Sequence, residues 1–300
     1  MSVNASSKPG ADGESTDARA LARRLTTSSK WFEPQPQELV ITLLGAFVRP
    51  SRESVWSGGL VQLLGEFGFS AGASRVALAR VVRRNLLARA KDGRRVYYTL
   101  TPRSSELLSE GDRRIFSLGR QTHRADQWTV LWHTIPDSQR LEHSRLTRRL
   151  RFLGFGSVQD GTWVSPHDRE AEVASLVASL GVSEYVAVLL GRPARSLDFL
   201  PFARRAWDLD HLDARYEAFA QEFSAYVPAR VRAQLSDRES FLLRTRLVHM
   251  FRVFPFLDPE LPDEYMSEPR NRSRAVKVFD SLYPALAPAA QRYFNAQTTC

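Results

Sequence analysis

The sequence contains very little cysteine, and this absence excludes several classes of protein. Its one cysteine is Cys300, so the 300 residues cannot form an internal disulfide or a cysteine-rich zinc site. No apolar run approaches membrane-spanning length, and the first residues lack the apolar core of a signal peptide. We therefore expect a soluble protein of the cytoplasm that does not contact a membrane.

Motifs for enzyme chemistry are also missing. The six histidines are scattered, without a ligand spacing such as His-x-x-x-His. The sequence has neither a glycine-rich phosphate loop nor the strand-turn-helix motif that carries a nucleophilic serine. We expect no enzyme activity, no bound metal and no cofactor.

Positive charge is in excess, and it is concentrated in one stretch. The chain has a formal net charge of +9, which favours an acidic partner such as nucleic acid. Between Arg75 and Arg95 only Asp92 is acidic, whereas the basic residues are Arg75, Arg80, Arg83, Arg84, Arg89, Lys91, Arg94 and Arg95. Such a local surplus is typical of a protein that binds duplex DNA.

The pattern within this stretch predicts a helix followed by a β-hairpin. Apolar residues recur at helical spacing at Leu78, Val81, Val82 and Leu86, and Ser70 can cap the helix. Asp92-Gly93 is a strong hairpin turn signal. With two helices expected over 37–48 and 57–67, this order predicts a winged helix-turn-helix whose helix enters the major groove.

The predicted DNA contacts divide by chemistry. Arginine can pair with guanine at two atoms, so Arg75, Arg80 and Arg83 are the candidates for base contact. Lys91, Arg94 and Arg95 at the hairpin are the candidates for phosphate contact. The full predicted DNA-binding set is Ser74, Arg75, Val76, Ala79, Arg80, Arg83, Lys91, Arg94 and Arg95. The alternative is a basic helix and hairpin that are merely solvated.

The chain divides by pattern into four segments of an α+β multidomain protein. Residues 1–33 read as a disordered arm, and residues 34–120 as the winged helix-turn-helix domain. Residues 121–196 alternate strand and helix in the order βαββαβ, which predicts a ferredoxin-like domain. Residues 197–300 show no convincing strand and predict an α-helical domain, in which Ser236 to Glu239 form a capping box.

Several motifs together resemble the PaaX-type transcriptional regulators, named for the repressor of phenylacetic acid catabolism. They are RVALAR at 75–80, RRVYYTLTP at 94–102, LGFG at 153–156 with WVSPH at 163–167, and LVH at 247–249 with DPELP at 258–262. The resemblance covers roughly residues 37–294 and departs from the family at 84–87, just before the hairpin. It implies a winged helix, a Cas2-like ferredoxin fold and a helical effector or dimerisation domain. It also implies repression of an aromatic catabolic operon, relieved by an aryl-CoA thioester such as phenylacetyl-CoA.

Six residues are candidates for binding this small acidic effector: Trp163, His167, Trp207, Arg246, His249 and Arg252. Arg246 and His249 share a mixed face of one predicted helix, where they could bind an acidic group. The tryptophans could form aromatic walls. The alternative is that all of these residues are structural.

The favoured hypothesis is a homodimeric repressor that binds an inverted repeat in double-stranded operator DNA. One alternative is a Cas2-like metal-dependent nuclease, for which Asp137 after the first strand would be the metal ligand, although it has no carboxylate neighbour in sequence. The other alternative is an architectural DNA-binding protein that responds to no effector.

Overall fold

The computed structural model describes residues 30–50, 54–120, 127–194, 196–262, 265 and 269–299. The chain groups into two compact units, each built from separate segments. Unit 1 comprises 1–110, 223–250 and 278–300, and unit 2 comprises 111–222 and 251–277. The predicted boundaries after residues 33, 120 and 196 stay a prediction. Of the predicted arm, only residues 30–33 are described, and there Phe32 is buried. Among the described helices, none has the length and apolarity to cross a bilayer.

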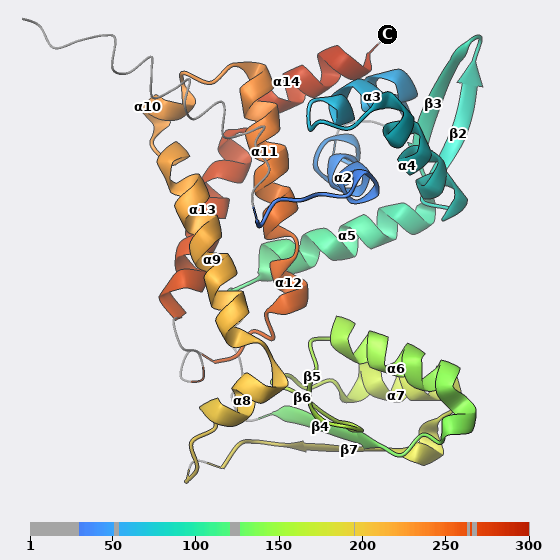
Figure 1. Cartoon of the computed structure of the whole chain (residues 1–300), viewed down its shortest axis with the longest axis vertical. Coiled ribbons are helices and arrows are strands. Elements are labelled where there is room, and N and C mark those ends of the chain that lie inside the picture. The colour runs from blue at the N-terminus through green and yellow to red at the C-terminus, as the bar shows by residue number, and fades with distance from the viewer. Residues whose placement is uncertain are drawn as a thin grey trace, which may run out of the picture. The chain divides into compact units, whose positions relative to one another are not determined.

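Unit 1 begins with helices and a small sheet (Figure 1). Its elements up to residue 117 are α2 (Pro36–Leu43), the π-helix η1 (Leu44–Val48), β1 (Ser54–Trp56), α3 (Ser57–Gly65), α4 (Ala71–Arg83), β2 (Leu87–Asp92), β3 (Arg95–Leu100) and α5 (Pro102–Ser117). Helix α5 begins in unit 1 and continues into unit 2. The predicted helix over 37–48 is present, but its last five residues have π geometry. The predicted helix, cap and hairpin that follow are confirmed.

Local chemistry sets the ends of α4. The Ser70 hydroxyl accepts a hydrogen bond from the Ala73 amide at 3.2 Å, which satisfies one of the free donors of the first turn. Asn85 has φ +56, a left-handed conformation that asparagine tolerates, and the chain leaves the helix there. Gly93 has φ +57 in the turn between β2 and β3, as a tight hairpin turn requires.

The sheet of unit 1 is antiparallel, in the order β1-β3-β2. The sequence predicts β2 and β3 but not β1, which has only three residues and therefore too few to show alternation. Val55 of β1 lies opposite Tyr98 of β3 and is buried. The short strand thus joins the hairpin to the helical core of this unit.

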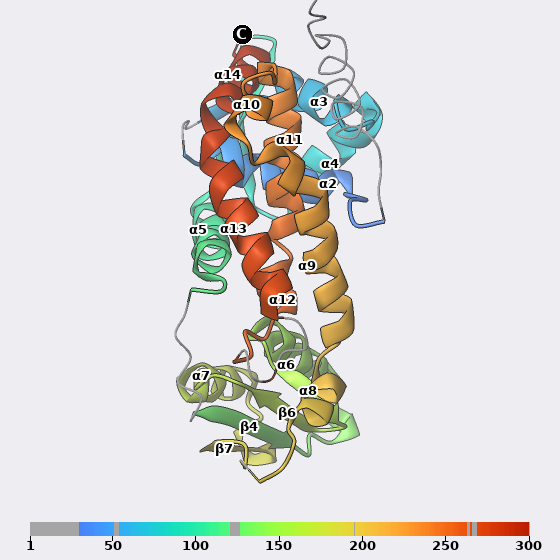
Figure 2. The ribbon, with the colours of Figure 1, turned by 90° about the vertical axis from the view of Figure 1, so that its left-hand side faces the viewer.

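Residues from the far end of the chain complete the core of unit 1. Helix α14 (Ala287–Thr298) packs on α3. The Phe294 ring is stacked on the Phe47 ring, with centroids 5.1 Å apart. The side-chain amide of Gln291 donates to the Phe47 carbonyl at 3.3 Å. The sequence does not predict α14. Figure 1 shows it beside α3, and Figure 2 shows it following α13 at the C-terminal end of the chain.

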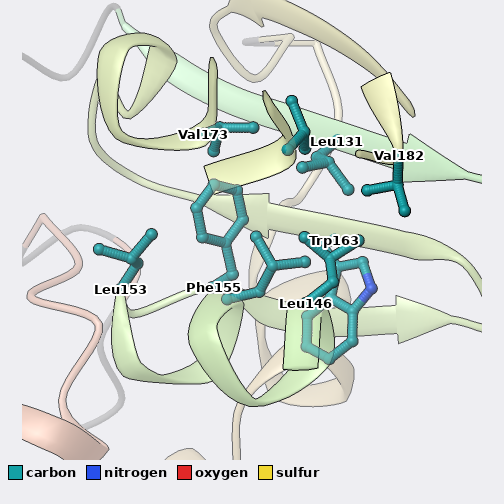
Figure 3. Close-up of a cluster of buried hydrophobic side chains, with 9 residues drawn as sticks. Leu131, Leu146, Leu153, Phe155, Trp163, Val173 and Val182 are labelled. Atoms are coloured by element: carbon teal, nitrogen blue, oxygen red, sulfur yellow. The ribbon is translucent and has the colours of Figure 1, made fainter. Parts of the chain in front are cut away.

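Unit 2 contains a four-stranded antiparallel sheet in the order β5-β6-β4-β7. Its elements are β4 (Trp128–His133), the 3-10 helix η2 (Asp137–Gln139), α6 (Arg140–Phe152), β5 (Gly156–Gln159), β6 (Thr162–Ser165), α7 (Glu170–Leu180), the 3-10 helix η3 (Ser183–Tyr185) and β7 (Val186–Gly191). This order confirms the predicted βαββαβ arrangement. Helices α6 and α7 cover one face of the sheet (Figure 1). Between helices and sheet lies an apolar cluster that includes Leu131, Leu146, Phe155 and Trp163 (Figure 3).

After residue 197 all described elements are helical, as predicted. They are α8 (Leu200–Ala206), α9 (Leu209–Phe223), η4 (Ser224–Tyr226), α10 (Ala229–Arg232), α11 (Asp237–Phe251), α12 (Phe254–Leu257), α13 (Pro269–Ala285) and α14. The capping box of α11 is confirmed, because the Glu239 amide donates to the Ser236 hydroxyl at 3.2 Å while the Ser236 amide donates to the Glu239 carboxylate at 2.8 Å.

Candidate nucleic-acid interface and ligand cavity

Helix α4 has one buried and one exposed face. Ala77, Leu78 and Val81 are buried in unit 1. The other face holds five residues of the predicted DNA-binding set, all of them exposed: Arg75, Val76, Ala79, Arg80 and Arg83. Val76, on this face, is 51% exposed.

Ser74 corrects the predicted DNA-binding set. Its side chain is fully buried, and its hydroxyl donates to the Ser70 carbonyl at 2.9 Å. The reason is helical spacing, because Ser74 lies three and four residues before the buried Ala77 and Leu78. Its hydroxyl is therefore on the opposite side of α4 from the exposed arginines.

The hairpin carries the second group of cations. Lys91, Arg94 and Arg95 are exposed around the turn that joins β2 to β3. With Arg75, Arg80 and Arg83, they form no side-chain hydrogen bond or ion pair to any residue that the structure describes. Six exposed cations are thus available to an external anion.

Two contacts, which the sequence did not reveal, fix the C-terminal end of α4 against α5. The Thr101 hydroxyl donates to the Asn85 carbonyl at 2.8 Å, and the Arg103 guanidinium donates to the Arg84 carbonyl at 3.3 Å. These carbonyls would otherwise lack partners where the helix ends. The helix is therefore held at the end from which the hairpin departs.

The predicted effector residues do not all gather at one place. Arg246 and His249 are buried in unit 1. The Arg246 guanidinium lies 4.2 Å from the centre of the Phe32 ring, and His249 Nδ1 is 2.9 Å from the Thr42 hydroxyl. Both side chains are therefore occupied in packing. Arg252 is half-buried and belongs to unit 2.

The other three candidates lie together in unit 2. Trp163 and Trp207 line a cavity of about 340 Å³. His167 Nε2 donates a hydrogen bond at 2.9 Å to the carbonyl of Pro259, which also lines the cavity. The remaining lining residues are Arg151, Gly154, Phe155, Ser157, Ala206, Asp208, His211, Leu212, Phe256 and Leu257. Sequence reasoning missed these residues because they come from segments far apart in the chain.

Hydrogen bonds hold both tryptophans in the cavity wall. Trp207 Nε1 donates to the Gly154 carbonyl at 3.3 Å, and Trp163 Nε1 donates to His133 Nε2 at 3.4 Å. This geometry requires a neutral His133 ring with a free Nε2 lone pair. Burial and the neighbouring His143 lower the pKa of His133, whereas Asp160 raises it. The pKa is lowered overall, which favours the neutral ring.

The cavity also has charged groups at its wall. The Arg151 guanidinium lies 5.8 Å from the Trp163 ring centre. Arg215 Nε donates to His211 Nε2 at 3.1 Å, and burial lowers the pKa of Arg215. A cavity with two indole walls and nearby cations suits an aromatic or apolar group attached to an anion.

Asp137, the candidate metal ligand of the nuclease hypothesis, is exposed on η2, with Arg140 as its ion-pair partner at 3.8 Å. Within the described ranges, no group of three or more His, Cys, Asp and Glu side chains could hold a metal ion.

Three protein-family models match consecutive parts of the chain. Residues 35–104 match the PaaX-like protein, residues 121–198 the PaaX protein central Cas2-like domain, and residues 207–296 the PaaX-like protein C-terminal domain. The transcriptional repressor PaaX of Escherichia coli (strain K12) is 28% identical over 267 residues, which cover 86% of this chain and 82% of that protein.

A solved structure shares the fold. The uncharacterized protein Rv0674 from Mycobacterium tuberculosis superposes with a TM-score of 0.53 at 21% identity, covering 88% of this chain and 98% of that one. The three matched segments span most of the described residues and include both α4 and the two tryptophans of the cavity. The chain belongs to the PaaX-like family.

Proposed function

We propose that this protein is a transcriptional regulator that binds operator DNA through a winged helix-turn-helix formed by α2, α3, α4 and the β2–β3 hairpin. The observation that carries this proposal is the set of six exposed cations on α4 and the hairpin that have no partner in the described chain. Similarity to a protein named as a transcriptional repressor supports it.

The two groups of cations have different roles. The exposed face of α4 enters the major groove, where Arg80 and Arg83 contact guanine edges and the Val76 side chain contacts a thymine methyl group. Lys91, Arg94 and Arg95 contact phosphates beside the site, which adds affinity without sequence information. A homodimer binds the two halves of an inverted repeat.

Variants that remove one group at a time test these roles. Kd is measured by fluorescence anisotropy for a duplex from upstream of the protein's own gene and for a random duplex, at several KCl concentrations. Arg80→Ala should reduce the preference for the upstream duplex by about tenfold or more. Arg94→Ala/Arg95→Ala should weaken binding to both duplexes. It should also lower the magnitude of the slope of log K against log[salt] by about 1.8 per protomer.

The control variant is Arg270→Ala/Arg274→Ala, which removes two exposed arginines of α13 that have no partner in the described chain. It changes the net charge equally but leaves α4 and the hairpin intact. If the hairpin variant and this control change Kd and the salt slope equally, the proposal that the hairpin contacts phosphates is contradicted. Absence of salt-sensitive binding to either duplex would refute DNA binding altogether.

The ligand cavity supports a second part of the proposal, an aryl-CoA effector that relieves repression of an aromatic catabolic operon. A volume of about 340 Å³ is at the small end for ligand sites, so it suits the aromatic acyl group and not the whole thioester. The acyl ring lies between Trp163 and Trp207, and Arg151 faces the anionic part. Binding favours a geometry with lower affinity for DNA.

Titration of phenylacetyl-CoA into the protein–DNA complex tests this part. Trp207→Ala should raise the thioester concentration needed for release by about tenfold, without changing DNA affinity in its absence. The control is Trp132→Ala, because Trp132 is 40% exposed on β4 and does not line the cavity. If the thioester never changes DNA affinity, the architectural protein is favoured. Metal-dependent cleavage that Asp137→Ala abolishes would favour the nuclease.

A further inference from the structure

Helix α6 carries a second concentration of positive charge, away from the α4 and hairpin cations in sequence. Its thirteen residues contain five arginines and one acidic residue, Glu142. Leu146 and Leu150 are buried in the core of unit 2, so the helix is fixed on the sheet by one side. On its opposite side Arg145, Arg148 and Arg149 are exposed at helical spacing, and we call these three residues the α6 arginine face.

Among the residues that the structure describes, none neutralises the charge of this face. Arg145 and Arg148 form no ion pair or hydrogen bond with any described residue. On the neighbouring helix α7, Glu172 is already paired with Arg169 at 2.9 Å. Arg145 and Arg149 are four residues apart, where like charges repel each other on a helix. An external polyanion would relieve this repulsion.

One arginine of the face is held in place by an aromatic ring. The Arg149 guanidinium lies 4.5 Å from the centre of the Phe152 ring, and that of Arg114 lies 4.1 Å from the same ring. Arg114 also donates to the Phe152 carbonyl at 3.0 Å. Two guanidinium groups are thus held against one ring at the C-terminal end of α6, where the helix dipole favours cations. The Arg149 side chain therefore loses less freedom when it binds a phosphate.

The shape of the face favours an extended anion over a small one. The three side chains project from the outer surface of a helix, and none of them lines the cavity beside Trp163 and Trp207. Arg151, on the same helix, does line that cavity. A small anion is usually enclosed by converging groups, whereas a DNA backbone presents a row of phosphates to a convex surface.

We infer that the α6 arginine face is a second DNA-contacting surface, which binds backbone phosphates of the duplex independently of its sequence. The inference rests on the proposed DNA-binding function but concerns a different unit of the chain. Its contribution is to affinity and to salt dependence, and base discrimination remains with α4.

The experiment uses the full chain with Arg145→Ala/Arg148→Ala, and Kd is measured for the upstream and the random duplex across a KCl series. Kd should rise for both duplexes by a similar factor, and the magnitude of the salt slope should fall by about 1.8 per protomer. Arg270→Ala/Arg274→Ala is the matched control, because it removes two exposed arginines at the spacing of one helical turn. Thermal denaturation verifies that both variants are folded.

An unchanged salt slope in Arg145→Ala/Arg148→Ala, with wild-type protein still binding DNA, would overturn this inference and leave the proposed function intact. A slope reduced equally in the control variant would overturn it too, since net charge alone would then account for the loss. Binding of coenzyme A to the α6 variant and to wild type is measured as a further test. If the α6 variant binds coenzyme A more weakly by calorimetry but binds DNA as wild type does, the face serves a small anion and the inference is wrong.

Discussion

Gly59 lies where α3 meets α14, and its replacement by alanine tests the packing of unit 1. A Cβ at this position would lie 2.3 Å from the Gln297 carbonyl oxygen and 2.7 Å from Thr298 Cα. Such contacts are essentially never shorter than 3.0 Å, so α14 would have to move away by at least 0.7 Å. Overpacking of this kind costs about 1–3 kcal/mol. Alanine recovers about 1 kcal/mol of helix propensity, so we expect a net loss of about 0–2 kcal/mol.

Gly65 provides the matched control on the same helix. A Cβ there meets nothing within 4 Å, so Gly65→Ala should stabilise the protein by about 0.5–1 kcal/mol. The assay is the free energy of unfolding from urea denaturation. In a chain that ends at residue 296 the obstructing carbonyl is gone, and the two substitutions should then have similar effects. Equal effects of the two substitutions in the full chain would refute the reasoning.

Three other predictions concern the cavity and the helix caps. Gly156→Ala should weaken the proposed release of DNA by phenylacetyl-CoA, because its Cβ would lie 2.6 Å from Trp207 Cε2 and displace that indole from the cavity wall. Unchanged release in the titration would contradict this. The lowered pKa of His133 means that its neutral ring stabilises the fold above about pH 6.5, the ordinary pKa, and that this stability is lost as the pH falls. The Tm of His133→Gln should therefore fall less steeply than that of wild type between pH 7 and pH 5, and parallel curves would show the assignment to be wrong. Ser236→Ala should lower the free energy of unfolding by about 1 kcal/mol in urea denaturation, because the Glu239 amide loses its acceptor. No loss would mean that the cap is redundant.

Local patterns were sufficient to predict much of the fold. The apolar spacing of α4, its Ser70 cap and the turn signalled by Asp92-Gly93 are encoded within a few residues. The structure has all three, with Gly93 and Arg94 as the two turn residues. Likewise, alternating strands and helices predicted the order of unit 2. Ser74 was misassigned because its distance from the apolar residues was not weighed, although the spacing to Leu78 was visible in the sequence.

Tertiary contacts were not predictable in this way. The sequence pointed to Trp163 and Trp207, but Arg151, His211 and Phe256 reach the same cavity only through folding. The mixed face of α11 suggested a ligand site at Arg246 and His249, yet the aromatic ring of Phe32, far upstream in the chain, packs against both side chains. No pattern within α11 contains that information.

The packing of Phe294 on Phe47 has a consequence for how this protein is made. The ribosome synthesises α2 to β3 long before α14, and at roughly 5–20 residues per second the interval is on the order of 10–50 s. During that interval the Phe47 ring lacks its stacking partner, and α3 lacks the helix that packs on it. A nascent chain that carries all the exposed arginines of α4 therefore has an unfinished core, and we expect it to acquire its full affinity for DNA only after synthesis has passed α14.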